Sequence, residues 1–436
     1  MSTQQAVDFV QTAGLDDVPE VAANEVRART LDTLAAITAG YRQAGVDITR
    51  EYAVTRLGGQ SVAAEATLLD GSATTLSAEG AALANAVAAN ALDVDDGHRK
   101  VKGHPAAVVV PPALAAAETV DASIGDFLDA IFVGYELAVR AGLAIHTIDD
   151  VYTGTGSWGA LGAAAAAARL FDLSPTATAH ALSVAEYHAP RTPIMRGVEN
   201  PGMTKDGIGW GAYVGVAATH LAASGFTGSG TVFDESDALD TLGDIYHVTR
   251  GYLKPYPCCR WAQPGVEAVL ALTDEYNIDP DQVNEIHVAT FGEATHLQTR
   301  QPESPEAAQY SYPYPIAAAL VRGRFTQAEH TTATRTDTEI RSLAECVNLV
   351  VDDEIDERFP NECLARVEIE TATETYTSPV TRPRGSRGRP LSDHERREKV
   401  RRLVTPTVAP TAVDEGADYL TTPATPVAEL TNLWEH

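Results

Sequence analysis

Cysteine is scarce in this chain, with four among 436 residues, which excludes a disulfide-rich scaffold. Cys258 and Cys259 are adjacent, whereas Cys346 and Cys363 stand alone. Because no CxxC spacing is present, the sequence offers neither a zinc ribbon nor an iron–sulfur cluster.

Basic residues are outnumbered, with 32 Lys and Arg against 60 Asp and Glu and a formal net charge of −28. Only five of the basic residues are lysines, namely Lys100, Lys102, Lys205, Lys254 and Lys399. A field of this sign repels nucleic acids and anionic membranes, so we expect neither as a partner. Because salt screens self-repulsion, an acidic and lysine-poor surface is typical of a high-salt cytoplasm, and we predict a halophilic source.

Long hydrophobic runs are also missing. The longest, Ala160–Ala168, is too short to span a bilayer and contains Gly162. The first residues, MSTQQAVDFVQTAG, lack the basic start and the long apolar stretch of a signal peptide. We therefore expect a soluble cytoplasmic protein, whose 44% hydrophobic content supplies a substantial core.

Apolar residues at helical spacing, many of them alanine, occupy residues 1 to about 250. The clearest helical segments are Val26–Ile37, Ala81–Ala91, Ile124–Ala141 and Trp158–Leu170. We interpret Pro111-Pro112, like other Pro and Gly pairs, as a separator between helices. Regular βαβ alternation is absent, which argues against a parallel-sheet fold.

The pattern changes from about residue 251. β-branched alternation predicts strands over Glu285–Phe291 and Ala365–Val380. Helical periodicity between these regions predicts helices over Gly265–Tyr276 and Ala307–Val321. Residues 251–390 are therefore expected to form an α+β insert.

The chain becomes helical again at residues 391–403, where Ser392 as N-cap and Glu395 three residues later predict a capping box. We expect this helix to return to the first domain, and the tail from Thr405, rich in Thr, Pro and acid, to be loosely ordered. The predicted fold is mainly α, with a large all-helical domain and a smaller inserted α+β domain. The expected boundaries are 1–250 plus 391–436 for the helical domain and 251–390 for the insert.

The densest polar cluster runs from Asp93 to Pro105 (DVDDGHRKVKGHP), between an Ala-rich segment and an apolar run. One interpretation is a solvated loop with N-cap aspartates. Two of the five lysines lie here, however, and local positive charge in a strongly negative protein favours a pocket for an anion. Asp and His also ligate Mn, Fe or Zn, but the neighbouring Lys and Arg disfavour a metal cation.

Lys205 follows a Pro-Gly turn and precedes a glycine-rich helix, Gly207–Ala223. Helix N-terminal amides beside a lysine make a seat for a carboxylate, whereas the helix dipole disfavours a cation that has no other role there. The alternative is a surface lysine at the start of a helix. His188 and Arg191 either face the same space or pack into the core.

The segment YTGTGSWG matches the GxGxxG pattern at Gly154, Gly156 and Gly159. A dinucleotide site also needs a preceding strand and a βαβ unit, and a helical bundle is predicted here instead. We therefore expect no dinucleotide, and interpret these glycines as sites of close packing.

Two further segments carry polar and aromatic residues. Lys254–Trp261 (KPYPCCRW) lies at the proposed domain junction, and its paired cysteines are usually small apolar filler. Tyr310, Tyr312 and Tyr314 lead into an apolar helical stretch, and core aromatics with satisfied hydroxyls are the common alternative to a functional role.

Six segments, taken in order, resemble the MmgE/PrpD family over nearly the whole chain. They are ALDVDD…GHPAAVVVPPALA, GTGSWGALGAAAAAARLFDL, GMTKDGIGWGAYVGVAATHLAASGFTG, KPYPCCRWAQPGVEAVLAL, AQYSYPYPIAAALVRG and PRGSRGRPLS. This family includes 2-methylcitrate dehydratase, cis-aconitate decarboxylase and iminodisuccinate epimerase. The resemblance implies a large all-helical domain, a smaller α+β lid inserted before the last helices, and a homodimer.

The resemblance also implies four catalytic residues, Asp93, His104, Lys205 and the lid tyrosine Tyr314. Three positions depart from the family pattern. Gly97 stands where cis-aconitate decarboxylases carry threonine, and Thr153 and Gln263 stand where many members carry histidine. These departures argue against cis-aconitate decarboxylation, and His98 or His188 is a candidate to supply the missing imidazole.

The reactions of the family share a carbanion made or consumed beside a carboxylate. That step needs a base for the C–H proton, an acid for a leaving hydroxyl and cations near the carboxylates. We expect His104, oriented by Asp93, to be the base or acid, and Tyr314 to transfer a proton when the lid closes. The expected substrate-binding residues are Arg99, Lys102, His188, Arg191 and Arg260.

Three functions stay open at this point. The leading one is a cofactor-free hydro-lyase that acts on a di- or tricarboxylic acid, similar to 2-methylcitrate dehydratase. An epimerase uses the same carbanion but needs two proton-transfer groups and no leaving-group acid. A non-catalytic carboxylate-binding protein is the third, and a metal hydrolase is an outside alternative. We expect neither a metal nor an organic cofactor.

Overall fold

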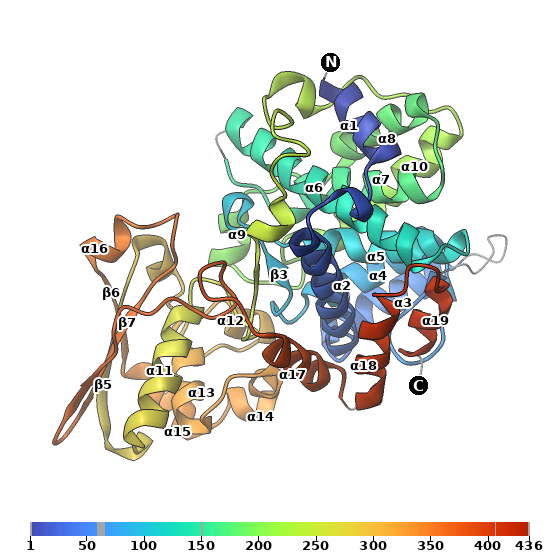
Figure 1. Ribbon diagram of the computed structural model, residues 1–436. Coiled ribbons are helices and arrows are strands. Elements are labelled where there is room, and N and C mark those ends of the chain that lie inside the picture. The colour runs from blue at the N-terminus through green and yellow to red at the C-terminus, as the bar shows by residue number, and fades with distance from the viewer. Residues whose placement is uncertain (1, 59–65, 150, 406, 435–436) are drawn as a thin grey trace.

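The computed structural model describes residues 2–58, 66–149, 151–405 and 407–434. A large helical domain and a smaller α+β domain lie side by side (Figure 1). One hydrophobic core gathers side chains from residues up to Val248 and from Val400 onward, and a second gathers side chains between Tyr256 and Ile369 together with Val198. The fold is therefore mainly α with a smaller α+β domain.

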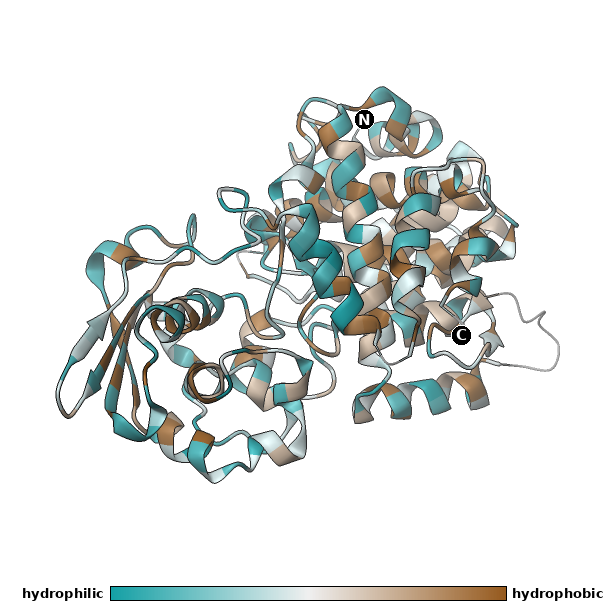
Figure 2. Ribbon diagram, turned by 60° about the horizontal axis from the view of Figure 1, so that its bottom comes forward, coloured by the Kyte–Doolittle hydropathy of each residue, from teal (hydrophilic) through white to brown (hydrophobic). Residues whose placement is uncertain are grey.

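Five helices pack together at the centre of the helical domain: α4 (Ala78–Asn90), α5 (Pro105–Thr119), α6 (Ile124–Ile148), α7 (Thr155–Leu170) and α10 (Ile208–Ala223). Small residues bring them close, because a β-carbon at Gly162 of α7 would lie 2.4 Å from the carbonyl oxygen of Gly134 in α6. Apolar segments, brown in Figure 2, gather where these helices face one another. Around the centre lie α1 (Ser2–Thr12), α2 (Glu20–Gly40), α3 (Ala44–Arg56), α8 (Pro175–His188), α9 (Ile194–Glu199) and the short strands β1 (Ala66–Thr67) and β2 (Thr75–Leu76).

The prediction that Pro111-Pro112 separates two helices is wrong. Both prolines lie inside α5 and are buried. Proline removes a backbone donor and crowds the preceding turn, so it normally ends a helix. Here α5 packs against α4 on one side and α7 on another, and this tertiary packing outweighs the local preference.

The prediction of a loosely ordered tail is also wrong. After Thr405 the chain forms α18 (Pro410–Tyr419) and α19 (Val427–Asn432). Trp434 is buried, and its indole packs against Gly416 in α18. A few apolar residues among many polar ones therefore dock the tail onto the helical domain.

The smaller domain is built on a mixed four-stranded sheet with the strand order β6–β5–β7–β8. β5 and β6 run parallel, and the other neighbouring pairs are antiparallel. The strands are β5 (Val283–Thr290), β6 (Val347–Val351), β7 (Arg366–Thr371) and β8 (Thr375–Thr377). Three helices lie beside the sheet (Figure 1): α11 (Gln263–Tyr276), α13 (Pro313–Arg322) and α15 (Thr338–Glu345). Short helices in the connections are α12 (Pro305–Gln309), α14 (Thr332–Arg335) and α16 (Asp353–Asp356).

Two details of this domain differ from the sequence predictions. The expected helix Ala307–Val321 is two helices, because the chain turns at Tyr310–Tyr312 and Pro313 starts α13. Strand β6 was not predicted. It is a short edge strand whose last residues are exposed, so it lacks the alternation that indicates a half-buried strand.

Backbone pairing ties the two domains together. Strand β3 (Asp96–Gly97) of the helical domain pairs with β4 (Tyr252–Leu253), where the chain leaves for the smaller domain. The returning helix α17 (Asp393–Val404) begins with the predicted capping box at Ser392. Within α17, the buried ammonium of Lys399 lies 2.6 Å from Asp32 Oδ1 and donates to the Val94 carbonyl. Among the described residues, no helix combines the length and hydrophobicity needed to cross a bilayer.

Candidate active site

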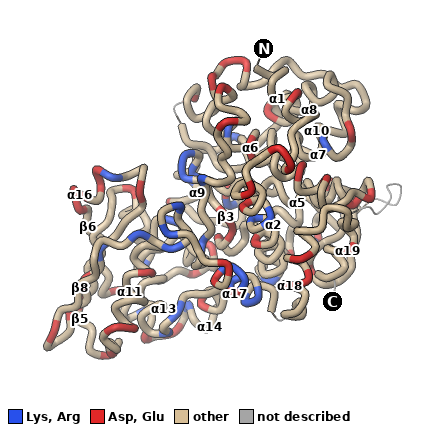
Figure 3. The backbone as a smooth tube through the Cα atoms, viewed as in Figure 1, with Lys and Arg blue, Asp and Glu red and all other residues tan. Residues whose placement is uncertain are grey.

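A cavity of about 70 Å³ lies where the polar segment 93–104 meets the smaller domain. Its walls come from that segment, from residues 194–206, 252–261 and 359–363, and from Tyr310. Basic segments, blue in Figure 3, gather where the two domains meet. The lining residues include Asp93, Arg99, Lys102, His104, Asp206, Tyr252, Lys254, Cys259, Arg260 and Tyr310.

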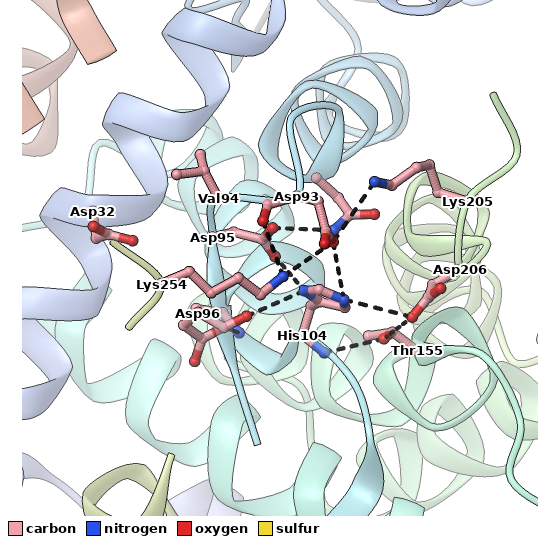
Figure 4. Close-up of polar contacts among 12 residues, drawn as sticks. Asp32, Asp93, Val94, Asp95, Asp96, His104, Thr155, Lys205, Asp206 and Lys254 are labelled. Atoms are coloured by element: carbon pink, nitrogen blue, oxygen red, sulfur yellow. Dashed lines mark hydrogen bonds and ion pairs between the residues drawn. The ribbon is translucent and has the colours of Figure 1, made fainter. Parts of the chain in front are cut away.

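Asp93 and Lys254 form the buried ion pair at the base of the cavity (Figure 4). Lys254 Nζ lies 3.0 Å from Asp93 Oδ1 and donates to the backbone carbonyl of Asp93 at 3.1 Å. The ammonium of Lys205 lies 3.6 Å from the same carboxylate oxygen. Asp93 has a φ of 52°, a left-handed conformation that is rare for residues other than glycine and that clusters at functional sites.

His104 stands at the N-cap position of α5 and faces three carboxylates. Its Nδ1 lies 2.9 Å from Asp95 Oδ2, and its Nε2 lies 3.6 Å from Asp93 Oδ1 and 3.7 Å from Asp206 Oδ2. The His104 backbone N–H donates to Thr155 Oγ1, and that hydroxyl donates to Asp206. The imidazole is therefore oriented through both ring nitrogens (Figure 4).

The charges of this group stabilise one another. Burial opposes ionisation of Asp93, but Lys254, Lys205 and His104 together hold its pKa below the ordinary value. Burial also opposes ionisation of Asp95, and His104 lowers that pKa again. For His104, burial lowers the pKa, yet the attraction of Asp95 prevails and the net pKa lies above 6.5. Asp93 likewise overcomes burial to raise the pKa of Lys254.

Asp96 supports the group from behind. Its carboxylate accepts hydrogen bonds from the Ala106 backbone N–H and the Tyr135 hydroxyl, both at 2.9 Å. Its backbone carbonyl lies 3.2 Å from His104 Nδ1. Burial raises the pKa of Asp96 to about 6. This residue thus anchors the start of α5 and with it the position of His104.

Lys205 joins the two domains at the cavity. Its ammonium donates to Gln309 Oε1 and lies 5.1 Å from the centre of the Tyr310 ring. Gln309 Nε2 in turn donates to the Ala91 carbonyl of the helical domain. Lys205 has a φ of 44° and directly precedes Asp206, so a strained turn before α10 presents both residues.

Arg260 is a buried cation that has no carboxylate partner among the described residues. Its guanidinium donates to the Gln263 side chain, the Arg384 carbonyl and the Ser386 hydroxyl, which are all neutral. No Asp or Glu of the described chain forms an ion pair with it. Burial lowers the pKa of Arg260. Because an unpaired buried charge is unfavourable, an anion bound in the cavity would stabilise this cation.

Arg99 and Lys102 lie at the other side of the cavity, against the smaller domain. Arg99 Nη1 lies 3.5 Å from the Pro360 carbonyl. Lys102 Nζ lies 3.9 Å from the centre of the Tyr152 ring and 5.5 Å from that of Phe359. Burial lowers the pKa of Lys102. Both side chains thus bring positive charge to the cavity from the helical domain.

Three residues expected in the site lie outside the cavity. Tyr314 is buried, and its hydroxyl donates to the Glu329 carbonyl. His188 is exposed at the end of α8, and exposed Arg191 forms an ion pair with Asp149 at 3.3 Å. The structure therefore brings Asp93, Arg99, Lys102, His104, Lys205 and Arg260 together and leaves these three apart.

The positions that depart from the family pattern have structural partners of their own. Gln263 Nε2 donates to the Tyr256 and Cys258 carbonyls, so this amide holds the turn before α11. The backbone N–H of Thr153 donates to Nε2 of His146 at 3.1 Å. His98 is buried beside His247, with ring centres 5.2 Å apart, and does not line the cavity.

Sequence reasoning missed Lys254, Asp206, Tyr252 and Tyr310 as cavity residues. A signal for Lys254 was present, because it is one of five lysines and begins the KPYPCC segment. Asp206 adjoins Lys205 and was overlooked beside it. Tyr310 lines the cavity in place of Tyr314, because the chain turns between α12 and α13.

The carboxylate and imidazole atoms of Asp93, Asp95 and His104 lie within 4.8 Å of one another, a spacing that suits a metal ion. Lys254, at 3.0 Å from Asp93, already places a positive charge at this point. A divalent cation would meet the repulsion of two ammonium groups there. The residues present therefore fit an ammonium-balanced acid–base site better than a metal site.

Two family models together match most of the chain. The model of the MmgE/PrpD N-terminal domain matches residues 4–242, and that of the MmgE/PrpD C-terminal domain matches residues 256–419. The chain belongs to the MmgE/PrpD family.

Relatives within the MmgE/PrpD family include fungal proteins. A cis-aconitate decarboxylase-like protein, oryM, of Aspergillus oryzae is 27% identical over 367 residues, which cover 74% of this chain and 75% of the relative. A cis-aconitate decarboxylase of Aspergillus terreus is 26% identical over 280 residues. That match covers 55% of this chain and 56% of the relative, so it spans little more than half of each.

Proposed function

We propose that this chain is a cofactor-free lyase of the hydro-lyase type, which acts on a di- or tricarboxylic acid through an enolate-like intermediate, similar to 2-methylcitrate dehydratase. The observation that carries the proposal is the pairing of two features in one cavity. Buried Arg260 has no counter-ion among the described residues, and His104, oriented by Asp95, lines the same cavity. A carboxylate beside an acid–base group is what C–H abstraction next to a carboxylate requires.

Each side chain then has a part in the elimination. Arg260, with Arg99 and Lys102, binds substrate carboxylates. Neutral His104 removes the proton from the carbon next to a carboxylate, and Lys254 stabilises the negative charge that develops on the carboxylate oxygen.

As the C=C bond forms, the hydroxyl on the neighbouring carbon departs with a proton from Tyr310 and leaves as water. Burial raises the pKa of Tyr310 well above its ordinary value, so the phenol holds its proton until the charge that develops on the departing hydroxyl draws it away. Tyr310 thus takes the role that the resemblance assigned to Tyr314.

Decarboxylation is the second candidate, favoured by the names of the two fungal relatives. Loss of CO2 from an unsaturated tricarboxylate yields the same kind of carbanion, which then takes a proton instead of expelling hydroxide. An epimerase would make the carbanion and return the proton on the opposite face. The three reactions share the site and differ in what leaves.

Proton NMR in D2O separates these functions. The protein is incubated at high salt with EDTA and, one at a time, 2-methylcitrate, citrate, cis-aconitate, malate and iminodisuccinate. Loss of a C–H signal with a new vinylic signal and release of water supports the hydro-lyase, and release of CO2 supports the decarboxylase. Exchange without a new product supports the epimerase. Activity that EDTA abolishes would contradict a metal-free site, and binding without any exchange would contradict catalysis.

We also propose a homodimer that forms through the face made by α3 and the start of α10. Four large apolar side chains are exposed there: Ile48, Tyr52, Met203 and Trp210, at 61%, 44%, 51% and 51%. They line a groove of about 840 Å³, and the same groove is bordered by Lys205 and Asp206. Exposed apolar surface of this extent marks an interaction site. A second copy of the chain would cover it and would support the turn before α10 that carries Lys205 and Asp206.

Sedimentation equilibrium tests the dimer. Wild-type protein is expected to sediment with twice the mass of the chain, and Trp210→Glu is expected to sediment as a monomer. Exposed Tyr187 lies outside the groove, so Tyr187→Glu serves as the control. A monomeric wild type, or a dimer that survives Trp210→Glu together with Ile48→Glu, would contradict the proposed face.

A further inference from the structure

Glycine is required at position 97 because no side chain fits there, and not because of the backbone conformation. A β-carbon at residue 97 would lie 2.4 Å from Cζ and from the hydroxyl oxygen of Tyr252. Gly97 is not among the described residues with positive φ, so its conformation is open to any amino acid. The tyrosine ring therefore lies directly on the bare Cα of Gly97.

This contact is built into the backbone pairing of the two domains. Gly97 and Tyr252 are direct cross-strand partners in the β3–β4 ladder. Strand β4 is clamped from its other side, because the Leu253 N–H donates to the Gly385 carbonyl and a β-carbon at Gly385 would lie 1.7 Å from the Leu253 carbonyl oxygen. Since β4 has no room to retreat, a side chain at residue 97 would displace the ring of Tyr252 and leave the strand in place.

The ring of Tyr252 also supports the unpaired cation of the cavity. The Arg260 guanidinium lies 4.3 Å from the centre of the ring, within cation–π distance. Tyr252 and Arg260 both line the cavity, and Tyr252 is almost fully buried. Displacement of the ring would therefore move a cavity wall and the guanidinium that we assign to a substrate carboxylate.

We propose that Gly97 and Tyr252 form one steric unit that determines which carboxylic acids the cavity accepts, by fixing both its width and the position of Arg260. This inference rests on the proposed function, because it takes Arg260 as the carboxylate-binding cation. Tyr252 acts here as a positioning and specificity residue. In a cavity of about 70 Å³, movement of one aromatic ring changes a large share of the space available to substrate.

A double-mutant cycle tests the unit. Gly97→Ala is expected to raise KM for the substrate at least about 10-fold with a smaller change in kcat, because ground-state placement of the carboxylate is disturbed. Tyr252→Phe keeps the ring and removes only its hydroxyl, so it is expected to raise KM less than Gly97→Ala does. Tyr252→Leu is expected to shift preference toward acids with a bulkier substituent.

The double variant Gly97→Ala/Tyr252→Leu is expected to have a kcat/KM at least about 10-fold above the product of the single effects, since leucine leaves room for the new methyl group. Gly292→Ala is the matched control, because its β-carbon would meet Asp356 at an ordinary 3.4 Å. Additive effects, or a Gly97→Ala enzyme with unchanged KM and substrate preference, would overturn the inference.

Binding keeps the test independent of turnover. Titration with citrate and with tricarballylate, followed by the intrinsic tryptophan fluorescence to which Trp261 in the cavity wall contributes, reports affinity for each variant. Wild-type binding that Gly97→Ala leaves unchanged overturns this inference alone. A wild type that neither binds nor converts any of the acids overturns the proposed function and this inference with it. If Gly97→Ala does not fold, recovery of folding and binding in the double variant supports the steric unit. If neither Gly97→Ala nor the double variant folds while Tyr252→Leu alone does, the steric unit is contradicted.

Discussion

At the scale of single residues, the site is a set of buried charges that depend on one another for stabilisation. Asp93 forms ion pairs with Lys205 and Lys254. The His104 ring lies between Asp95 on one side and the Asp93 and Asp206 carboxylates on the other. Buried ion pairs of this kind contribute little net stability, because desolvation offsets most of the attraction. Their arrangement is therefore better explained by the protonation states that they impose.

Removal of Lys254 or His104 is expected to stop the reaction. Lys254→Met removes the group that stabilises enolate charge, and we expect kcat/KM to fall by about 10²–10³-fold. His104→Gln removes the base, with an expected fall of about 10²–10⁴-fold. Lys100→Met is the control, since Lys100 is exposed and does not line the cavity.

Turnover of each variant is measured by the NMR assay, and circular dichroism checks that the fold persists. The same assay applies to Lys205→Ala and His104→Ala, which we also expect to be inactive. Wild-type rates in the His104 and Lys205 variants would show that the site has been placed wrongly.

The pH dependence of kcat/KM should report His104. Its pKa is raised above the ordinary value of histidine, so the neutral, proton-accepting form becomes dominant at a higher pH than in a free imidazole, and activity is expected to rise with pH through that limb. Asp95→Asn removes the charge that raises this pKa, so the limb is expected to move to lower pH. A pH–rate profile of the two enzymes measures the shift. An acid limb below 6.5 in the wild type, or a limb that Asp95→Asn leaves in place, would contradict His104 as the base.

Residue chemistry was predictable from the sequence where rare residue types cluster. The polar segment 93–105 and Lys205 stand out because lysine and histidine occur there in a chain that otherwise avoids lysine, and the resemblance to the family then selects Asp93 and His104 within that segment. Tyr310 and Tyr314 are not separable in this way, since both belong to one aromatic run. The choice between them depends on the turn between α12 and α13, which is a property of the folded domain.

At the scale of elements, the helical domain depends on close approach of helices through small residues. The crossing of α6 and α7 places Gly134 and Gly162 against each other, with each backbone carbonyl where the other residue's β-carbon would lie. Alanine elsewhere on these helices provides helix propensity without bulk. Such an interface tolerates little added volume.

A methyl group at this crossing is expected to destabilise the protein. Gly162→Ala would place Cβ 2.4 Å from the Gly134 carbonyl oxygen, so the helices must separate, and we expect the free energy of unfolding to fall by about 1–3 kcal/mol. Gly202→Ala is the control, because no atom lies within 4 Å of its β-carbon position. Chemical denaturation of the three proteins measures the difference. Equal stability of Gly162→Ala and wild type would show that α6 and α7 can move apart freely.

Elements with strong periodicity were predictable, and those that depend on partners were not. The Ala-rich helices and the capping box at Ser392 follow from local sequence. Helix α5 continues through Pro111 and Pro112 only because α4 and α7 enclose it. The helices after Thr405 form because Trp434 finds a buried place, which local composition does not reveal.

At the scale of the whole molecule, the charge of −28 acts on every folded part at once. Many basic residues gather near the junction of the domains, and acidic residues are spread over both domains (Figure 3). An anionic substrate therefore approaches a negative protein toward a local region of positive charge. Self-repulsion of the surface opposes the compact state unless salt screens it.

Stability is accordingly expected to rise with salt. The Debye length falls from about 10 Å at 0.1 M to about 3 Å at 1 M salt, so repulsion between surface carboxylates is largely screened. We expect the midpoint of thermal unfolding to increase between 0.1 M and 2 M KCl, measured by calorimetry. Sucrose at matched osmolality separates screening from general exclusion effects. A midpoint that is constant or falls with KCl would contradict the halophilic character predicted from the composition.

The return of α17 to the helical domain has a consequence for the order in which the protein is made. Lys399 is the partner of buried Asp32 and donates to the Val94 carbonyl, next to Asp93. The ribosome synthesises α2, the polar segment 93–104 and the entire smaller domain before this lysine emerges. Until then Asp32 lacks its cation and the chain around Asp93 lacks its support. We therefore expect the proposed activity only once synthesis is complete, and nascent chains cut short before α17 to carry Asp93 and His104 without the assembled site.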